Sequence, residues 1–530
     1  MSAEKNAPAT TSEGIGRRSF MRGAAGFSLL ASGLGAPNLA RGQSARPNVL
    51  MIVLDDLNDW VEPLKGYPGV RTPNIAKLAA TGRVYLNAQA NVPACSPSRT
   101  STLFGMHPTT TGGYTNAEEW QYNRFLRNYR SLPFHFRNNG YATYATGKVF
   151  HSHSVDAIDG IDPDAWNDFQ FCTAGEDVCA INVRGDGDAP LLNGQPMEFS
   201  QYARTQGGFS NFDFGPYYTP EEVPDTVRAR WMANNILNRS HGQPFFAACG
   251  IMKPHLPFIV PREFFNLYPG RSLVYPPGVL DRLNNAPTTN RDLADLGTTG
   301  GRINAYLSDH NRLIQSGEWL VVVQSYLAAI SYADFCVGIL MNSLRRGPNA
   351  NNTIVVLWSD NGFQLGEKLA WRKFTLWERS LRVPFIFAGP GIQRTASTMP
   401  ASLIDIYPTL CDFAFGSVPN HLQGRSLRSN LTTGANTHGH SVATWLEPST
   451  RPSNGPHFSI RTAEHRYIRY ESGEEELYDH RYDPYETNNL LFAGTRVTQG
   501  SLRVANRLRP LVPAGPYSPR RGVAPGGGSE

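Results

Sequence analysis

The chain has 530 residues, of which 40% are hydrophobic and 18% are charged, a composition typical of globular proteins. Its formal net charge is +5. Five Lys and Arg residues against two Glu residues place +3 of that charge in residues 1–45 and leave +2 for the remainder. A balance this close to neutral gives no support to a nucleic-acid partner, but it allows a local basic pocket for an anionic substrate.

Residues 1–45 have the character of a targeting segment. Arg17 and Arg18 precede a weakly apolar run, rich in Gly and Ala, that extends to about Ala40. Paired arginines before such a run resemble a twin-arginine export signal, which predicts a periplasmic or secreted protein. This run is too short and too weakly apolar to predict stable membrane insertion, and no other stretch is long and apolar enough. The alternative interpretation is a disordered basic arm.

Continuous apolar runs predict three buried strands of a parallel sheet, over residues 48–54, 244–251 and 352–358. Asp55 and Asp56 end the first strand, and Asp360 and Asn361 follow the third. Open α/β sheets bind ligands at such strand ends, and adjacent carboxylates repel each other unless a cation holds them. These four side chains offer only hard oxygen ligands, which suit Ca²⁺ or Mg²⁺ rather than Zn²⁺ and fit Ca²⁺ better. A solvated turn is the alternative at either strand end.

The segment around Cys95 reads Cys-Ser-Pro-Ser-Arg and lies at a predicted junction between a loop and a helix. Prolines on both sides of the cysteine mark the loop, and a helix is predicted from Ser98, as its cap, to Phe104. Backbone N–H groups at a helix N-terminus favour an anion, and Arg99 adds a positive charge. The pattern therefore predicts a position that stabilises a thiolate, or an oxygen anion derived from Cys95. The alternative is a buried structural cysteine.

Basic and histidine residues follow the same predicted strand ends. Lys148 and His151 come after a fourth predicted strand, His255 follows the second, and Lys373 follows the third. A divalent cation surrounded by Lys, Arg and His suits an oxyanion ester, because the cations neutralise its oxygens while a His or Lys transfers protons. Taken alone, each histidine has the alternative of a packed or exposed loop residue.

Helices are predicted over 72–79, 131–139, 225–239, 318–344 and 403–413, and further strands over 141–146 and 383–387. Weak periodicity over 152–222 and 270–305 predicts long loops around a pocket. Alternating residues predict antiparallel strands at 457–461 and 466–470, followed by a helix near 497–510. The predicted organisation is an export segment (1–45), a catalytic α/β domain (46–440), a smaller α+β subdomain (441–515) and a disordered tail (516–530).

The six cysteines show no zinc-binding spacing. Cys172 and Cys179 lie close together in a Gly-containing loop, which predicts a local disulfide in an exported protein. Cys249 and Cys336 lie in apolar runs and are predicted to be core residues.

The segment from Cys95 to Arg99 matches the C-x-P-x-R signature of type I sulfatases. The resemblance extends from about Pro47 to Leu490 and includes Asp55-Asp56, Gly147-Lys148, Lys253-Pro254-His255, Ser359-Asp360-Asn361-Gly362, Gln423-Gly424-Arg425-Ser426-Leu427 and Leu477-Tyr478-Asp479. The Lys-Pro-His motif and the Lys-x-x-His spacing at 148–151 are most similar to the iduronate-2-sulfatase branch. This resemblance implies an alkaline-phosphatase-like fold, in which helices flank a mixed, mostly parallel sheet.

The resemblance also implies a sulfuric ester hydrolase that releases sulfate from a sulfated saccharide. A formylglycine-generating enzyme would oxidise Cys95 to formylglycine before folding, and its hydrate would supply the attacking oxygen. The implied calcium ligands are Asp55, Asp56, the modified Cys95, Asp360 and Asn361.

The implied catalytic set is completed by basic residues and histidines. Arg99 would stabilise the hydrate, and Lys148 and Lys373 would bind the sulfate group. His151 would act as the base in sulfate release, and His255, helped by Lys373, would protonate the leaving alcohol.

One residue departs from the iduronate-2-sulfatase branch, which usually carries His where this chain has Asn361. Asn remains an adequate oxygen ligand, so the departure concerns the substrate, whose pocket is expected to involve residues 155–222 and 270–312. A phosphonate or phosphate monoester hydrolase is the alternative enzyme on this scaffold. A non-catalytic receptor for sulfated glycans is a third reading, and the sequence carries no signal for an oligomeric state.

Overall fold

The computed structural model describes residues 46–151, 163–170, 191–192, 195–196, 214–217, 223–279, 304–446, 455–492 and 497–521. From Arg46 onward the chain forms one compact unit. The export segment predicted over 1–45, most of the loop predicted over 155–222, and the predicted Cys172–Cys179 disulfide lie outside the described residues.

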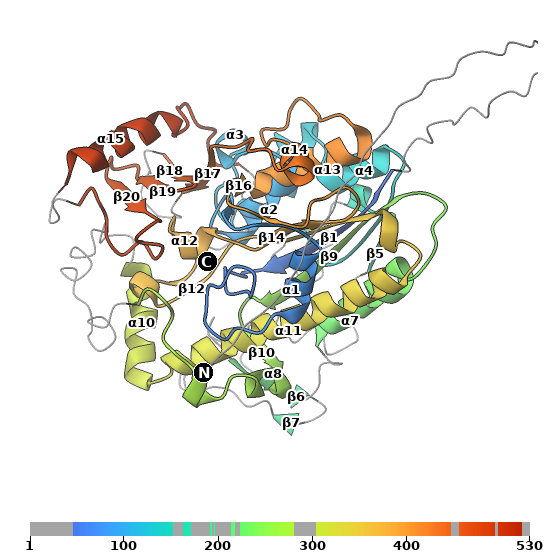
Figure 1. Cartoon of the computed structure of the whole chain (residues 1–530), viewed down its shortest axis with the longest axis horizontal. Helices are drawn as coiled ribbons and strands as arrows, with labels where there is room; N and C mark the ends of the chain where they lie inside the picture. The colour runs from blue at the N-terminus through green and yellow to red at the C-terminus, as the bar shows by residue number, and fades with distance from the viewer. Residues whose placement is uncertain are drawn as a thin grey trace, which may run out of the picture. The chain divides into compact units, whose positions relative to one another are not determined.

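An eight-stranded sheet forms the centre of the unit (Figure 1). Its order is β15 (Ala396–Ser397), β2 (Gly82–Tyr85), β14 (Phe385–Ala388), β11 (Thr353–Ser359), β1 (Asn48–Asp55), β9 (Phe245–Pro254), β4 (Ala142–Gly147) and β5 (Asp168–Gln170). The five strands from β11 to β5 are mutually parallel, whereas β14 pairs antiparallel with both β11 and β2. The sheet is therefore mixed and mostly parallel, as predicted.

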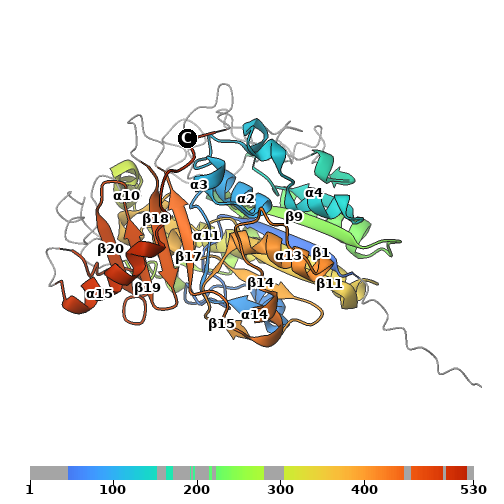
Figure 2. The same ribbon diagram turned by 90° about the horizontal axis from the view of Figure 1, so that it is seen from above.

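The central strand β1 is buried on both faces, and its alternate residues belong to different cores. Leu50, Ile52 and Leu54 pack against α1 (Pro73–Ala80), α7 (Pro224–Met232), α8 (Arg262–Asn266) and α11 (Trp319–Arg346). The opposite face packs against α2 (Cys95–Phe104), α4 (Leu132–Asn138) and α13 (Ile406–Phe415). Figure 2 shows helices on both sides of the sheet. Cys249 and Cys336 are fully buried, as predicted.

The 28-residue helix α11 is long and apolar enough to cross a membrane, which no other helix among the described residues is. However, 78% of its most apolar 18-residue window is buried inside the protein. Its apolar character is therefore accounted for by its packing against the sheet.

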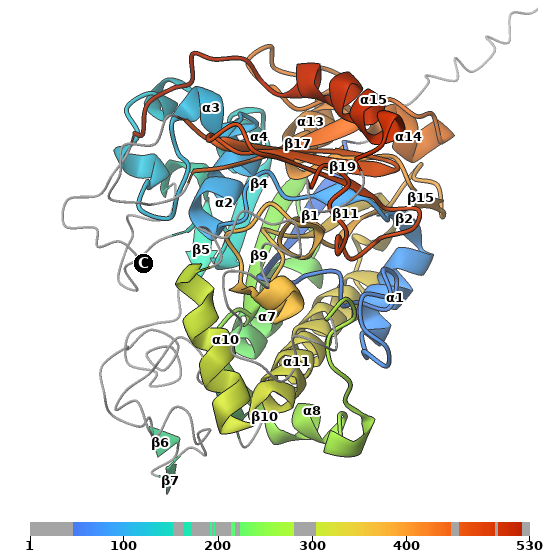
Figure 3. The same ribbon diagram turned by 90° about the vertical axis from the view of Figure 1, so that its left-hand side faces the viewer.

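A second, four-stranded antiparallel sheet follows in the sequence. Its strands are β17 (His440–Trp445), β18 (His457–Thr462), β19 (His465–Arg469) and β20 (Glu475–Asp479), in that order. Helix α15 (Gln499–Leu508) covers this sheet through a separate apolar cluster (Figure 3). The antiparallel strands predicted at 457–461 and 466–470 are confirmed, whereas the predicted boundaries of a subdomain over 441–515 remain a prediction.

The shorter elements are β3 (Ala88–Gln89), β6 (Leu191–Leu192), β7 (Gln195–Pro196), β8 (Phe214–Tyr217), β10 (Phe258–Pro261), β12 (Gln364–Leu365), β13 (Trp371–Arg372), β16 (Ala401–Ser402), α3 (Pro108–Thr111), α10 (Asn304–Ser316), α12 (Glu378–Leu381) and α14 (Arg428–Thr433).

Three parts of the chain differ from their local prediction. Helix α2 begins at Cys95 rather than at Ser98, because Pro97 occupies the first helical turn, where its missing N–H costs nothing. Helix α10 occupies part of the loop predicted over 270–312. Residues 516–521, predicted to belong to a disordered tail, lie along α3 and hydrogen-bond to it.

Candidate active site

The candidate site lies where the parallel strands end. Asp55 is the last residue of β1, and Asp56 follows it in a left-handed conformation with φ of 62°. Asp360 follows β11, and Lys148 follows β4. Cys95 occupies the first helical position of α2, so one helix N-terminus meets the carboxyl ends of the sheet.

Acidic and sulfur atoms converge at this point. One ligand atom each from Asp55, Asp56, Cys95 and Asp360 lies within 4.8 Å of the others, and all four residues are buried. The thiol of Cys95 is 3.4 Å from Asp55 Oδ1 and 3.7 Å from Asp56 Oδ1.

Asn361 supplies an oxygen that the rest of the described chain does not use. Its Nδ2 donates to Asp56 Oδ1 at 2.7 Å, whereas its Oδ1 is buried and accepts no hydrogen bond from a described residue. An unsatisfied buried acceptor beside three carboxylates is a costly arrangement without a cation. The donor set of hard oxygens therefore fits a divalent ion such as Ca²⁺ or Mg²⁺.

Three permanent cations surround the carboxylates. Lys148 Nζ is 2.5 Å from Asp55 Oδ2, and Lys373 Nζ is 2.7 Å from Asp56 Oδ1 and 2.8 Å from Cys95 Sγ. The Nε of Arg99, which is completely buried, donates to Asp360 at 2.7 Å, and its Nη2 is 3.3 Å from Asp55. The formal charges of the three carboxylates and the three basic side chains sum to zero. A bound divalent ion would therefore leave the cluster positive and attractive to an anion.

The two histidines occupy different positions. His255 Nε2 is 3.7 Å from Asp56 Oδ2, and its Nδ1 lies 2.5 Å from the carbonyl oxygen of Leu256. That carbonyl accepts a hydrogen bond from Nδ1–H, and Nε2 faces the acidic cluster. His151 is buried three residues beyond Lys148, in the segment that follows β4. Its role as a base remains a prediction.

Burial and neighbouring charges shift the pKa values of Asp55 and Cys95 in opposite directions. Burial by itself raises the pKa of Asp55, but the charges of Lys148, His255 and Arg99 hold that pKa well below its ordinary value. Burial raises the pKa of Cys95 well above its ordinary value, and the neighbouring Asp55 raises it further. The sequence predicted a stabilised thiolate or an oxygen anion derived from Cys95. The raised pKa disfavours the thiolate, even though Lys148 and Lys373 act in the opposite direction, and the oxygen anion stays a prediction.

Several residues that support the cluster were missed by reasoning from the sequence. The amine of Lys253 donates to the carbonyl of Pro257 at 2.7 Å and so braces the turn that carries His255. Asn116 Oδ1 accepts from the backbone N–H of Ser96, and Ser96 Oγ donates to the carbonyl of Glu118. Only Lys253 had a local signal, in the Lys-Pro-His motif.

The loop that carries Lys373 is strained. Four residues between 368 and 374 have φ from 52° to 72°, a region that residues other than Gly seldom adopt: Lys368, Leu369, Arg372 and Phe374. Arg372 Nε donates to Asp309 of α10 at 3.0 Å, and the N–H of Phe374 donates to the carbonyl of Pro93. These contacts on both sides of Lys373 hold its amine beside Cys95.

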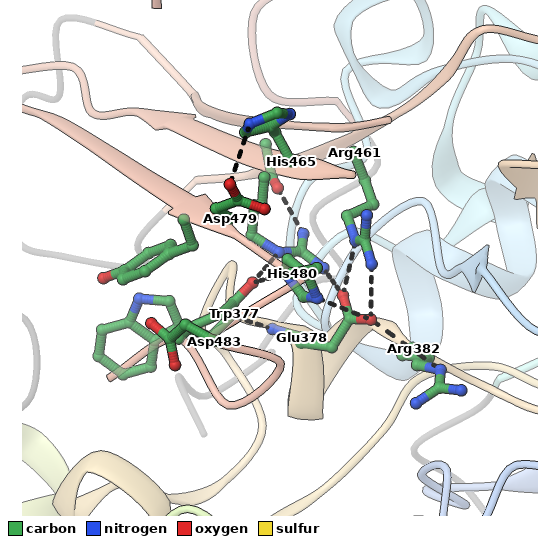
Figure 4. Close-up of polar contacts among 12 residues, drawn as sticks. Trp377, Glu378, Arg382, Arg461, His465, Asp479, His480 and Asp483 are labelled. Carbon is green, nitrogen blue, oxygen red and sulfur yellow. Dashed lines mark hydrogen bonds and ion pairs between the residues drawn. The ribbon is translucent and has the colours of Figure 1, made fainter. Parts of the chain in front are cut away.

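A second group of ionisable residues follows this loop and joins α12 to the C-terminal sheet (Figure 4). Glu378 pairs with Arg461 and Arg466, and Glu486 pairs with Arg466 and with His480 Nε2. Burial raises the pKa of Glu378, but Arg461, His480 and Arg466 hold it well below its ordinary value. Glu378, His480 and Glu486 are close enough to ligate a metal, yet the arginines already occupy both carboxylates, so this group is an ion-pair network.

Comparison with known protein families agrees with this geometry. The sulfatase family model matches residues 47–417, and the model of the N-sulphoglucosamine sulphohydrolase C-terminal region matches residues 366–510. The first match contains the whole cluster around Cys95, and the second contains the four-stranded sheet.

Relatives of known sequence lead to the same family, and a solved structure shares the fold. A sulfatase of Formosa agariphila is 32% identical over 461 residues, which are 84% of each chain. Human iduronate 2-sulfatase is 31% identical over 390 residues, covering 72% of this chain and 66% of the relative. The fold matches that of Agrobacterium radiobacter phosphonate monoester hydrolase with a TM-score of 0.67 and 19% identity, covering 88% of this chain and 95% of that one. The chain thus belongs to the sulfatase family and is a sulfuric ester hydrolase.

Proposed function

We propose that this enzyme hydrolyses a sulfate monoester of a saccharide, using a formylglycine formed from Cys95 and a calcium ion held beside it. One observation carries the proposal: the Cys95 side chain lies among three carboxylates and Lys373, at a helix N-terminus, where burial raises the pKa of its thiol well above the ordinary value. A nucleophile at this position needs a different chemical form. The hydrate of formylglycine would supply both an attacking oxygen and a second hydroxyl that permits release of sulfate by C–O cleavage.

The proposed calcium ligands are Asp55, Asp56, Asp360, Asn361 and the modified residue 95. When bound, the ion would act as a Lewis acid that orients the sulfate group and neutralises its charge. The buried Oδ1 of Asn361 and the 4.8 Å cluster of ligand atoms support this assignment.

The remaining residues divide into anion binders and proton carriers. Lys148 and Lys373 would hold the sulfate oxygens, because their amines already converge on the cluster from two sides. Arg99 is fixed by Asp360 and by the carbonyls of Lys148 and Val149, and it orients the residue at position 95.

Proton transfer is assigned to the two histidines. The Nε2 atom of His255 would give a proton to the leaving alcohol, since this side chain is 28% exposed and so reaches the open side of the cluster. His151 would accept the proton of the second hydroxyl as sulfate departs. The enzyme returns to its starting state when the proton of the attacking hydroxyl replaces the one lost by His255, His151 releases its proton to solvent, and water adds to the aldehyde to re-form the hydrate. One turnover then consumes one water and yields the alcohol, sulfate and one proton.

A saccharide substrate is supported by the similarity to human iduronate 2-sulfatase, although the chain carries Asn361 where that branch usually carries His. Export through residues 1–45 is also part of the proposal. Fractionation of the producing cell tests it, with cleaved protein expected outside the cytoplasm and uncleaved cytoplasmic protein contradicting it.

The decisive experiment is mass spectrometry of the tryptic peptide from residue 84 to residue 99, together with sulfate release from an aryl sulfate by the same sample. We expect a mass loss of ~18 Da at Cys95, for a thiol converted to an aldehyde, and turnover that disappears in Cys95→Ala. Turnover with an intact thiol would refute the formylglycine mechanism.

Paired rates on an aryl sulfate and an aryl phosphonate distinguish the leading function from its alternative on the same scaffold. We expect the higher kcat/KM on the sulfate. A higher value on the phosphonate would establish the phosphonate monoesterase instead, and binding of sulfated glycans without any Cys95-dependent turnover would favour a receptor.

A further inference from the structure

The segment that follows the Cys95 helix forms a basic depression together with the C-terminal segment. It is lined by Tyr122, Arg124, Phe125 and Arg521 and has a volume of about 560 Å³, and it is called the Arg124 pocket below. This volume lies within the range of ~300–1,000 Å³ that small-molecule sites occupy. Tyr122 is 39% exposed, and the guanidinium of Arg521 lies 5.1 Å from the ring centre of Phe125.

The C-terminal segment is held in place by its backbone, which fixes Arg521 at the pocket. The N–H of Ser518 donates to the carbonyl of Thr109 at 2.9 Å, and the N–H of Arg521 donates to the carbonyl of Gly112 at 2.9 Å. Figure 3 shows this segment passing beside α3. Gly112 permits the approach, because a Cβ there would lie 2.2 Å from the carbonyl oxygen of Pro519.

Among the described residues, the pocket arginines have no acidic partner. Residues 122–130 contain three arginines and no acidic residue. Within the described part of the chain, no carboxylate lies within ion-pair distance of Arg124 or Arg521, whereas the adjacent Arg520 pairs with Glu118. Two like charges that line one depression repel each other, so an anion between them would be stabilised.

The segment that leads to the Arg124 pocket contacts residues beside the active site. Glu118 and Asn116 hold Ser96, the neighbour of Cys95, through its Oγ and its N–H. Trp120 packs on Phe150, 5.2 Å between ring centres, and Phe150 precedes His151. The segment from Asn116 to Phe125 therefore runs from the neighbour of Cys95 to the Arg124 pocket.

We propose that the Arg124 pocket binds a second anionic sugar unit of a sulfated oligosaccharide whose first sulfate lies at the active site. Arg124 and Arg521 would contact a sulfate or carboxylate of that unit, and Tyr122 would stack on its ring. This inference rests on the proposed function and refines it: the substrate is a chain with charged groups on more than one sugar, because a monosaccharide sulfate does not need the second cationic site.

The test measures binding, so that it does not depend on turnover. Isothermal titration gives the Kd of a sulfated dextran oligosaccharide, of neutral dextran of the same length and of inorganic sulfate, for the unaltered enzyme and for Arg124→Glu, Arg521→Glu and Tyr122→Ala. Arg346→Glu, an exposed substitution at the end of α11, is the matched control. Melting temperatures verify that each variant is folded.

We expect the sulfated oligosaccharide to bind and neutral dextran not to bind. Each charge reversal in the pocket should raise the Kd about tenfold or more, Tyr122→Ala should raise it several-fold, and Arg346→Glu should leave it unchanged. Equal Kd values for Arg124→Glu and the unaltered enzyme would overturn the proposal, as would an equal loss in the Arg346 control. Failure of the proposed function is distinguishable, because it appears as absent Cys95-dependent hydrolysis of an aryl sulfate, whatever the Kd values are.

Discussion

Two buried groups of acids and bases in this protein have similar composition and different character. Around Glu378 and Glu486, the planar guanidinium groups of Arg461 and Arg466 and the imidazole of His480 engage the carboxylates. No buried side-chain nitrogen or oxygen of these five residues lacks a hydrogen-bond partner.

The group around Cys95 is instead incomplete. Its carboxylates pair with the amines of Lys148 and Lys373 and with the guanidinium of Arg99. The buried Oδ1 of Asn361, however, has no donor among the described residues. The contrast shows that a high density of charged side chains does not by itself identify a functional site. The Glu378 network, in which every buried polar atom has a partner, holds α12 against the C-terminal sheet. The Cys95 cluster, in which a buried oxygen has none among the described residues, can accept a cation and an anion.

The substitution Cys95→Ala should have the largest effect, and it tests whether the Cys95 cluster is catalytic. We expect the rate on an aryl sulfate to fall about 10⁴-fold or more, because the nucleophile is lost, while the melting temperature changes little. Steady-state assays and thermal melts measure both quantities. Residual activity above one part in about a hundred would contradict the role of Cys95, and Cys411→Ala, in α13, is the control for loss of a buried cysteine.

Removal of divalent metal should produce the next largest effect. Treatment with a chelator should lower activity by about 100-fold, since a metal supplies several kcal/mol of charge stabilisation, and Ca²⁺ should restore it better than Mg²⁺. The melting temperature should rise with added Ca²⁺, by mass action on the folded state. Asn361→Ala should weaken this thermal response, and a response that is the same in that variant would contradict the ligand assignment.

A substitution in the Glu378 ion-pair network should affect the stability of the protein and not its catalytic rate. Glu378→Gln leaves Arg461 and Arg466 buried without their full counter-charge, which should lower the free energy of unfolding by about 3 kcal/mol. Urea titration followed by fluorescence measures the shift, with exposed Glu474→Gln as the matched control. Loss of activity in the folded variant without loss of stability would show that the group is part of the catalytic machinery.

The stabilisation that the Glu378 ion-pair network gives to the folded state should also decrease at low pH. Burial raises the pKa of Glu486, but Arg466 and His480 outweigh it and hold that pKa at about 2. A depressed pKa stabilises the folded state fully above the ordinary value of about 4.5 and loses that contribution as the pH falls toward 2. The stability difference between the unaltered enzyme and Glu486→Gln should therefore be about 3 kcal/mol at pH 7 and shrink below pH 4.5. A difference that does not change between pH 7 and pH 3 would contradict the assignment.

Much of the fold follows from local patterns. The apolar runs at 48–54, 244–251 and 352–358 became β1, β9 and β11, since runs of β-branched and aliphatic residues suit strands buried on both faces. The same pattern located Asp55 and Asp360 at strand ends. Cys95 at a helix N-terminus was also predictable, although the helix begins three residues earlier than its polar residues indicate.

Contacts between distant segments were not predictable in this way. Glu378 meets partners 83 and 88 residues away, and its own surroundings in the sequence carry no signal for them. Residues 516–521 have a composition that favours disorder, yet backbone hydrogen bonds to α3 hold them, and these bonds are independent of side-chain type.

The sequence by itself determined five of the eight strands of the central sheet, the candidate oxygen ligands at the strand ends, and the family signature at Cys95, because these features depend on neighbouring residues. Only the tertiary structure decided that burial raises the pKa of the Cys95 thiol and that Arg521 joins Arg124 at a pocket. It also decided that the buried polar atoms of the Glu378 group all have hydrogen-bond partners, whereas Asn361 Oδ1 beside Cys95 has none among the described residues. The pKa of a buried group, its hydrogen-bond partners and its contacts with distant residues depend on burial and on the distances between charges. These quantities exist only after the chain has folded.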